Sequence, residues 1–500
     1  MKQDTDTLNE ETLDPEEWDS MQALGYRMVD DMLDYLKTVR DRPVWKHAPE
    51  DVKARFDRPV PLDPQPPQEV YQEFIEYVLP YAIGNIHPRF WGWFFGTGTV
   101  FGSFAEFLTA VMNTNSGDFD HHSAIHVEKQ VVDWFKELLG FPTSSSGTLT
   151  SGCSAANLIG LAVARNAKAG YDVRRKGMRA APQNMVLYAS AEIHSSIHKA
   201  VELLGLGSEA LRLIPVSDQF QIDLEALQSS IANDRQDGCQ PFCVVGAAGT
   251  VNTGAFDDLQ ALADICQDEA LWLHVDGAFG AWAVLAPGGC ELVKGIERAD
   301  SLAFDLHKWM YMPYEIGCVL VRHAEQHRKA FALTAAYLAK DGDGRGLSGG
   351  DIPWFTDYDF QLSRRFRSLK VWMSLKEHGI RKYGRLIQQN IDQAKYLGEL
   401  VDAAPDLELV APVTLNVVCF RYVNAGLNGP ALDALNKEIL VELQERGIAV
   451  PSGTTIKGKY VLRVGHTNHR TRREDFRMLV REVSRLGVEL AGSLALFIGT

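Results

Sequence analysis

The sequence predicts an α/β fold with a mostly parallel sheet, joined to a smaller α+β domain. Between Gly147 and Arg322, short apolar runs typical of buried strands alternate with helix-length segments. This order indicates parallel strands connected by helices that cover the sheet. Further along the chain, two more strands alternate with two helices. We therefore expect a helical arm and aromatic segment at residues 1–100, a large domain at 101–378 and a small domain at 379–500.

Length and composition are those of an ordinary globular protein. The 500 residues are 46% hydrophobic and 23% charged, which is enough chain for two or three domains. A net charge of −15 argues against nucleic-acid binding as a main role. The seven cysteines are scattered, as expected for free thiols in a reducing compartment. The acidic N-terminus is not a secretory signal and no apolar run approaches about 20 residues, so we expect a cytoplasmic protein without a membrane partner.

The N-terminal segment predicts a helical arm. A proline-rich stretch at residues 58–68 follows it and indicates an extended linker. Chains that begin with an isolated helix and a proline-rich arm often wrap a second subunit, so we expect a homodimer. The helix is indicated between Glu16 and Val39 by apolar residues three or four positions apart: Met21, Leu24, Met28, Met32 and Leu36.

Two stretches before residue 130 allow more than one interpretation. His87–Gly102 is dense in aromatic residues and then in glycine, which favours a loop lining a cavity over a dinucleotide fingerprint, because the glycine spacing is wrong. Ordinary core packing is the alternative. The second stretch predicts either a metal site or the solvated first turn of a helix at 127–139, and its candidate ligands are Asp118, Asp120, His121, His122 and His126.

Gly147–Asn157 precedes a helix of small residues and predicts a cup for an anion. Thr150, Ser151 and Ser154 can donate hydroxyl groups, and Gly152 permits close backbone approach. The amides at a helix N-terminus favour a phosphate. A simple capped helix is the alternative.

Chemically useful residues follow several strands of the predicted sheet. His194 comes after a strand at 185–190, Thr250 after one at 242–248, and Asp276 after one at 271–275, where Gly277 and Ala278 follow. In open α/β sheets, ligands bind at the carboxyl ends of the strands. We therefore expect these side chains to meet at one edge.

Lys308 lies between the predicted strands Ser301–Phe304 and Ile316–Val321. A buried lysine needs a salt bridge, a lowered pKa or a covalent role as an amine nucleophile. Asp305 could provide the salt bridge. A lysine and an acid at one sheet edge suit pyridoxal phosphate, which needs an amine for its aldehyde and an acid for its ring nitrogen. An ion pair between this acid and the protonated ring nitrogen, at about 4 Å, is worth roughly 4 kcal/mol at an effective dielectric near 20.

Taken together, these motifs resemble the group II pyridoxal-phosphate decarboxylases, which include the aromatic-L-amino-acid, histidine and glutamate decarboxylases. HVDGAF resembles the family's H-V-D-A-A, DLHKW its H-K-W, TSGCSAAN its T-S-G-G-T/S-E-A-N, and AEIHSS its A-H-S-S. Cys153 and Ala155 depart from the third of these motifs. The resemblance covers roughly residues 70–490. It implies fold type I, a homodimer, bound pyridoxal phosphate and decarboxylation of an L-amino acid.

The resemblance also implies roles for individual residues. Lys308 would bind the cofactor, Asp276 its pyridine nitrogen, and His194 would stack on its ring. AAYLAKD resembles the start of the family's catalytic loop, so Tyr337 would donate a proton to the substrate carbon. It lies just before a glycine-rich segment that we expect to be a mobile loop. The remaining residues expected around the cofactor are Gly152, Cys153, Ser154, Thr250, Ala278, Asp305 and His307.

The residues expected to line the substrate pocket allow more than one kind of amino acid. The positions that resemble the family's aromatic pocket are Phe94, Phe95 and Thr97, which favours an aromatic amino acid. Ser116 and Asp118 fall where aromatic decarboxylases place apolar side chains, which keeps diaminobutyrate-like substrates open. An aldehyde synthase and a metallohydrolase are further alternatives.

Overall fold

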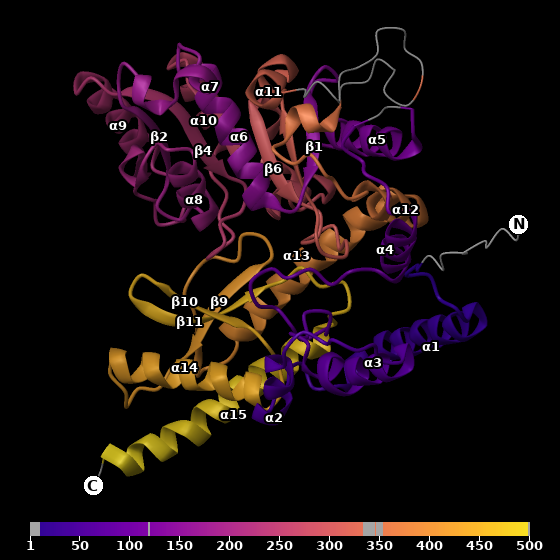
Figure 1. The fold of residues 1–500 in the computed structure, drawn as a ribbon. Helices are drawn as coiled ribbons and strands as arrows, with labels where there is room; N and C mark the ends of the chain where they lie inside the picture. Colours follow the sequence, from indigo (N-terminus) through magenta and orange to yellow (C-terminus); the bar gives the residue numbers. More distant parts are fainter. Residues whose placement is uncertain (1–10, 119–120, 334–345, 347–353, 499–500) are drawn as a thin grey trace, which may run out of the picture. The chain divides into compact units, whose positions relative to one another are not determined.

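The computed structural model describes residues 11–118, 121–333, 346 and 354–498 (Figure 1). The chain divides into two compact units, Met1–Gly84 and Asn85–Thr500. The first contains the helices α1 (Trp18–Lys37), α2 (Glu50–Lys53) and α3 (Pro67–Glu73). Tyr71 on α3 is buried and its hydroxyl donates to Asp31 on α1 at 2.9 Å, which ties the two helices together. The predicted N-terminal helix is thus confirmed, and the aromatic segment belongs to the second unit.

A seven-stranded sheet is the centre of the second unit, in the order β1-β7-β6-β5-β4-β2-β3. The strands from β6 to β3 are parallel, whereas β7 runs antiparallel to both of its neighbours. The predicted mostly parallel sheet is confirmed. The strands are β1 (Ser146–Thr150), β2 (Met185–Ser190), β3 (Leu211–Ile214), β4 (Gln240–Ala247), β5 (Trp272–Asp276), β6 (Ser301–Asp305) and β7 (Gly317–Val321).

Helices cover both faces of this sheet because successive strand residues point to opposite sides. Val245 packs in a core with α6 and α8, whereas its neighbour Val244 packs in the other core, which includes residues of α5, α9 and α10. The helices of this region are α4 (Val100–Met112), α5 (Ser123–Leu138), α6 (Cys153–Lys168), α7 (Val173–Lys176), α8 (Ser195–Leu203), α9 (Leu224–Gln236), α10 (Leu259–Asp268) and α11 (Ala324–Phe331).

The C-terminal part contains a second, antiparallel sheet in the order β10-β11-β9-β8. Its helices α13 and α14 pack in one core with these strands. The elements are α12 (Ser368–His378), α13 (Ile380–Asp402), β8 (Leu407–Leu409), β9 (Val417–Tyr422), α14 (Gly429–Glu445), β10 (Ser452–Ile456), β11 (Lys459–Gly465) and α15 (Arg473–Ile498).

Short 3-10 and π turns connect these elements: η1 (Val39–Asp41), η2 (Ala54–Asp57), η3 (Phe74–Val78), η4 (Leu79–Tyr81), η5 (Met178–Ala180), η6 (Ser208–Ala210), η7 (Gly280–Leu285), η8 (Cys290–Val293), η9 (Ile296–Arg298) and η11 (Phe355–Tyr358). In the described chain, no helix combines the length and the apolar character needed to span a bilayer.

Candidate active site

The carboxyl ends of β5 and β6 bring two carboxylates and one amine together. Lys308 lies in the turn after β6, and its Nζ is 2.9 Å from Oδ2 of Asp305, the last residue of that strand. The other oxygen of Asp305 accepts the backbone N–H of Cys153, the first residue of α6, at 2.6 Å. Asp305 therefore connects the lysine to the N-terminus of α6.

This ion pair decides the protonation of Lys308. Burial lowers the pKa of the ammonium, but Asp305, Cys153 and Asp276 oppose burial, and the net result is a pKa above the ordinary value. Of the three ways of burying a lysine that the sequence allowed, the structure shows the salt bridge. The amine must lose this proton before it can act as a nucleophile.

Asp276 is buried at the end of β5 and is held by three donors. Its Oδ1 accepts the N–H of Ala278 at 3.1 Å and the thiol of Cys153 at 3.5 Å, while Oδ2 accepts from Asn157 Nδ2 at 3.1 Å. Burial and the nearby carboxylates raise the pKa of the Cys153 thiol, which keeps its proton available for this bond. Within the described residues Asp276 has no ion pair.

His194 stands at the N-cap of α8, after β2, as the sequence predicted. Its Nδ1 accepts the backbone N–H of Ser196 at 3.2 Å. Burial lowers the pKa of His194, and the carboxylates of Asp276 and Asp305 only partly offset that effect. A pKa below the ordinary value of about 6.5 favours the neutral ring at pH 7.

Glycines allow three backbone segments to meet beside Lys308. A Cβ placed on Gly317, at the start of β7, would lie 2.7 Å from the backbone of Gly152 and 2.9 Å from Asp305 Oδ1. A Cβ on Gly96 would overlap the carbonyl oxygen of His307. The aromatic segment thus packs directly against the lysine turn.

The other residues expected around the cofactor lie at the same edge or on the turns beside it. The hydroxyl of Thr250 accepts the N–H of Ala255 at 3.1 Å, within its own turn. His307 is buried, accepts the N–H of Ile316 at Nδ1, and has a pKa lowered by burial. Ser154 is exposed in the first turn of α6.

The side chains of the aromatic segment differ in their burial and in their contacts. Phe94 is buried and stacks on Phe279 at a centroid distance of 3.9 Å. The guanidinium of Arg463 on β11 lies 4.6 Å from the centroid of Phe94, on the same ring. Phe95 is half-buried, and Thr97 is buried with a hydroxyl that has no hydrogen-bond partner within the described part of the chain.

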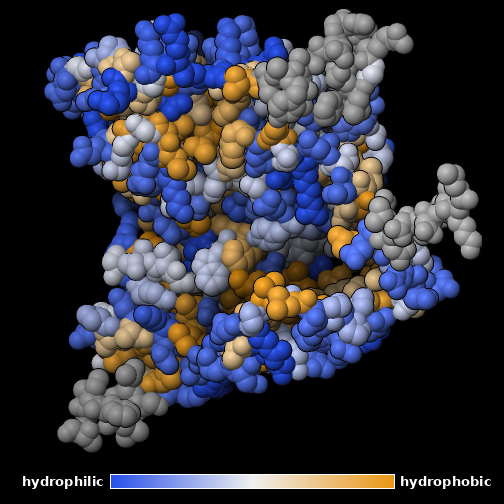
Figure 2. All heavy atoms as spheres, viewed as in Figure 1, coloured by the Kyte–Doolittle hydropathy of each residue, from blue (hydrophilic) through white to orange (hydrophobic). Residues whose placement is uncertain are grey.

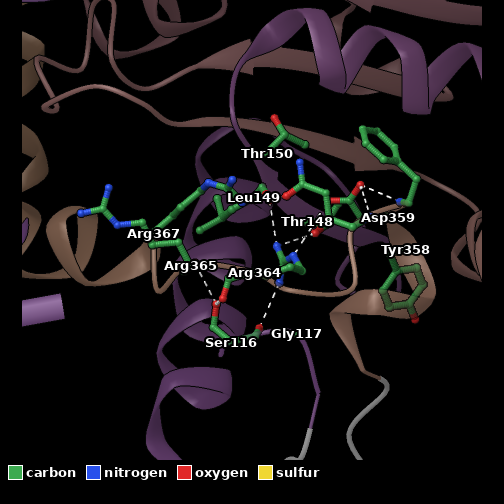
Figure 3. Close-up of polar contacts among 12 residues, drawn as sticks. Ser116, Gly117, Thr148, Leu149, Thr150, Tyr358, Asp359, Arg364, Arg365 and Arg367 are labelled. Carbon is green, nitrogen blue, oxygen red and sulfur yellow. Dashed lines mark hydrogen bonds and ion pairs between the residues drawn. The ribbon is translucent and has the colours of Figure 1, made fainter. Parts of the chain in front are cut away.

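Ser116 belongs to a polar cluster centred on Arg364 (Figure 3), and Asp118 is connected to the same cluster through Asn115. The hydroxyl of Ser116 donates to the carbonyl of Arg365 at 2.9 Å, and Arg364 donates back to the carbonyl of Ser116 at 3.0 Å. Asp118 accepts from Asn115 at 3.1 Å, and burial raises its pKa.

Arg364 is an anchor that the sequence analysis missed. It is almost fully buried, pairs with Glu128 at 2.6 Å, and donates to Thr148 and Leu149 of β1 at 2.9 and 2.8 Å. It thereby fastens the Ser116 segment to the strand that leads into the N-terminus of α6. A run of three arginines in RRFR was visible, but nothing in it distinguished the buried one. Arg463 also carries no signal in the sequence, and Asn157 lies in the TSGCSAAN motif, but nothing in that motif indicated its contact with Asp276.

Two predictions fall on residues 119–120 and 334–345, so Tyr337 and Asp120 lie outside the described residues. Of the described residues, no group of three or more histidine, cysteine or acidic side chains is arranged to hold a metal ion. His122 Nε2 instead lies 2.9 Å from the carbonyl oxygen of Asp118.

Comparison with known proteins decides the family. Residues 49–423 match the family model described as the pyridoxal-dependent decarboxylase conserved domain. The chain belongs to the pyridoxal-dependent decarboxylases. It is a pyridoxal-phosphate-dependent lyase, as the sequence predicted.

Individual relatives of this decarboxylase cover nearly its whole length. It is 34% identical to an aromatic-L-amino-acid decarboxylase of Bacillus atrophaeus, over 95% of this chain and 96% of the relative. It is 29% identical to a histidine decarboxylase of Rattus norvegicus, over 95% and 72%. The crystal structure of Oryza sativa TDC with PLP and tryptamine superposes with a TM-score of 0.88 at 25% identity, covering 96% and 100%. The predicted fold type I is confirmed.

The donor set of this decarboxylase fits its cofactor. An amine, a buried acid that forms no ion pair with any described residue, and the N-terminus of α6 lie at one edge of the sheet. These are the groups that an aldehyde, a ring nitrogen and a phosphate require.

Proposed function

We propose that this enzyme converts an aromatic L-amino acid to the corresponding amine and carbon dioxide. The observation that carries the proposal is the aromatic segment packed against the lysine turn. Gly96 lies on the carbonyl of His307, and Phe94 stacks on Phe279, which follows Asp276 and Ala278. An amino acid bound at Lys308 would therefore lie next to aromatic side chains, which favour an aromatic ring.

The proposed roles follow from the position of each group. Lys308 would hold the cofactor through its amine and later release the product. Asp276 would keep the ring nitrogen protonated, and His194 and Ala278 would bound the two faces of the ring. Bound pyridoxal phosphate supplies a ring that takes up the electron pair left when the carboxylate departs. The residues proposed to surround the phosphate and the rest of the cofactor are Gly152, Cys153, Ser154, Thr250, Asp305 and His307.

Two features of the proposed mechanism concern protons. The neutral His194 adds no charge beside Asp276, so the carboxylate is left free to bind the ring nitrogen. Tyr337 would return a proton to the substrate carbon once carbon dioxide has left. A hydroxyl at that position favours the amine over an oxidised aldehyde product.

A polar amino acid such as diaminobutyrate is the alternative substrate, and Asp118 is the observation that favours it. This carboxylate is buried, and burial raises its pKa. A substrate ammonium beside it would supply an opposite charge.

Product analysis tests both versions of the proposal. Purified protein with added pyridoxal phosphate would be given all common L-amino acids, diaminobutyrate and 3,4-dihydroxyphenylalanine. We expect aromatic amines and carbon dioxide without hydrogen peroxide. A diamine would contradict the aromatic assignment, and an aldehyde with hydrogen peroxide would contradict simple decarboxylation.

We also propose that the enzyme is a homodimer. Helix α4 exposes a row of large apolar side chains that nothing in the described part of the chain covers, and an exposed row of this kind is typical of a protein interface. The row consists of Val100, Phe101, Phe104, Phe107, Leu108, Val111 and Met112.

A further inference from the structure

Asp276 and His194 are connected by a continuous run of hydrogen bonds. Asn157 Nδ2, on α6, lies 3.1 Å from Asp276 Oδ2 and 3.0 Å from the hydroxyl oxygen of Ser196. That hydroxyl oxygen lies 2.8 Å from His194 Nδ1. One buried amide therefore contacts both the carboxylate at the end of β5 and the start of α8.

The surroundings fix the orientation of the Asn157 amide. The carboxylate of Asp276 can only accept, so the NH₂ group must face it, and Oδ1 faces His274 Nε2 at 2.9 Å. Burial lowers the pKa of His274 to about 4, so its ring is neutral. Its single proton must lie on Nε2, because Asn157 Oδ1 cannot donate.

The hydrogen bonds on the other side of His274 also have only one possible direction. Ser301 Oγ accepts the indole N–H of Trp272 at 2.8 Å, so its own hydroxyl hydrogen is left for His274 Nδ1, also at 2.8 Å. Every donor from Trp272 to Asn157 has one acceptor. His274 therefore fixes the Asn157 amide, which cannot flip without leaving buried groups unpaired.

The hydrogen bonds around His194 also determine which ring nitrogen carries its proton. The backbone N–H of Ser196 donates to His194 Nδ1, so that nitrogen carries no proton. Ser196 Oγ accepts from Asn157, and its hydroxyl hydrogen then donates to Nδ1 as well. The single proton of the neutral ring lies on Nε2.

We propose that Asn157 and Ser196 are positioning residues: Asn157 orients the Asp276 carboxylate and, through Ser196, holds His194 neutral with its proton on Nε2. This inference rests on the proposed roles of Asp276 and His194. The charged groups that act on His194 are Asp276 and Asp305, which raise its pKa, and Lys308 and Lys199, which lower it. None of the four is altered by a change at Ser196 or Asn157.

The first test measures the pKa of His194 directly in the cofactor-free protein. Imidazole ¹⁵N resonances of histidine-labelled protein would be followed with pH, and the His194 signals assigned by their loss in His194→Asn. The Ser196 hydroxyl can donate only to unprotonated Nδ1. We therefore expect Ser196→Ala to raise the pKa of His194 by about 0.5 to 1 unit. Asn157→Ala should raise it too, because the freed hydroxyl could then accept a proton from Nδ1.

Two matched variants control this measurement. Ser196→Thr keeps the hydroxyl, and Ser195→Ala removes the hydroxyl of the exposed neighbour in the same helical turn. Both should leave the pKa of His194 at the wild-type value. A wild-type pKa in Ser196→Ala would overturn the proposal, and this variant alone decides the question if Asn157→Ala does not fold.

The second test measures the dissociation constant of pyridoxal phosphate by absorbance titration of the cofactor-free protein. We expect Asn157→Ala to weaken binding about tenfold or more, because a hydrogen bond to a buried carboxylate is lost. Ser195→Ala should bind as the wild type does. Unchanged binding in a folded Asn157→Ala protein would overturn the assigned role. A wild type that binds the cofactor but releases no carbon dioxide would instead refute the proposed function.

Discussion

At the residue scale, Lys308 and Asp305 decide the chemistry of the site. A buried ammonium is stabilised by a carboxylate 2.9 Å away, and that carboxylate also accepts the first amide of α6. The sequence was enough to predict Lys308, Asp276 and His194 at one sheet edge, because each follows a strand. It could not reveal Asn157, Arg364 or Arg463, since their roles depend on contacts between distant segments.

Replacing Lys308 with alanine should leave a folded but nearly inactive protein. We expect carbon dioxide release to fall by at least about a thousandfold, because no other described group supplies the amine. Lys395→Ala, which removes an exposed lysine on α13, should keep wild-type activity. Turnover of Lys308→Ala near the wild-type rate, without added amine, would contradict the assignment.

His327 should make the protein sensitive to acid. It is fully buried, it bonds to Ser146 and to the carbonyl of Tyr358, and burial lowers its pKa to about 3. Between pH 6.5 and 3 the unfolded chain binds a proton there and the folded chain does not. The contribution of His327 to the free energy of unfolding should therefore fall as pH falls, by up to about 1.4 kcal/mol per pH unit, and stop changing below pH 3.

Thermal unfolding between pH 4.5 and 7 checks this expectation. His327→Gln should be less stable at pH 7, yet its midpoint should decrease less on acidification than that of the wild type. His47→Gln, at an exposed position, should keep the wild-type dependence. An equal dependence in His327→Gln and the wild type would show that this histidine does not titrate as the structure implies.

At the scale of elements, the strands that carry the site were predicted to within one or two residues. The apolar runs that became β2, β4, β5, β6 and β7 are buried along nearly their whole length, which makes their signal strong. β10 was missed because its sequence, SGTTI, is mostly polar. It pairs with β11 across Lys457-Gly458, both with positive φ, and such pairing is not visible in hydrophobicity alone.

The contact between β7 and α6 can be tested by a single methyl group. Gly317→Ala would push against the backbone of Gly152 and against Asp305. Overpacking of this kind costs about 1 to 3 kcal/mol, so pyridoxal phosphate should bind about tenfold more weakly or worse. Gly429→Ala is the control, since a Cβ on that helical residue meets no atom within 4 Å. Equal cofactor affinity in the two variants would contradict the described packing.

At the scale of the whole molecule, the order of strands and helices along the sequence was the main basis for predicting the fold. Alternating strands and helices indicated a parallel sheet, and the motifs located its functional edge. Surfaces are harder to predict, because burial within a subunit and burial in an assembly give the same apolar pattern. Figure 2 shows hydrophobic residues gathered in patches among hydrophilic ones on the face that it draws.

The apolar row on α4 predicts how the dimer can be broken. Val111→Asp would place a charge where we propose that a second subunit packs, and burying an unpaired charge is costly. We expect sedimentation velocity to show a monomer. Val488→Asp is a matched control, because Val488 on α15 is 67% exposed and Val111 is 70% exposed. A Val111→Asp protein that sediments as a dimer would refute the interface, as would a monomeric wild type.

We propose that Lys308 holds the cofactor at the edge of the sheet. Borohydride reduction of the cofactor-loaded protein, followed by peptide mass spectrometry, tests it most directly, because reduction makes the bond between a lysine and the cofactor permanent. The pyridoxyl group should be found on the peptide that contains Lys308, at close to one per chain. A label on another lysine, or no label in a protein that has bound the cofactor, would contradict the account.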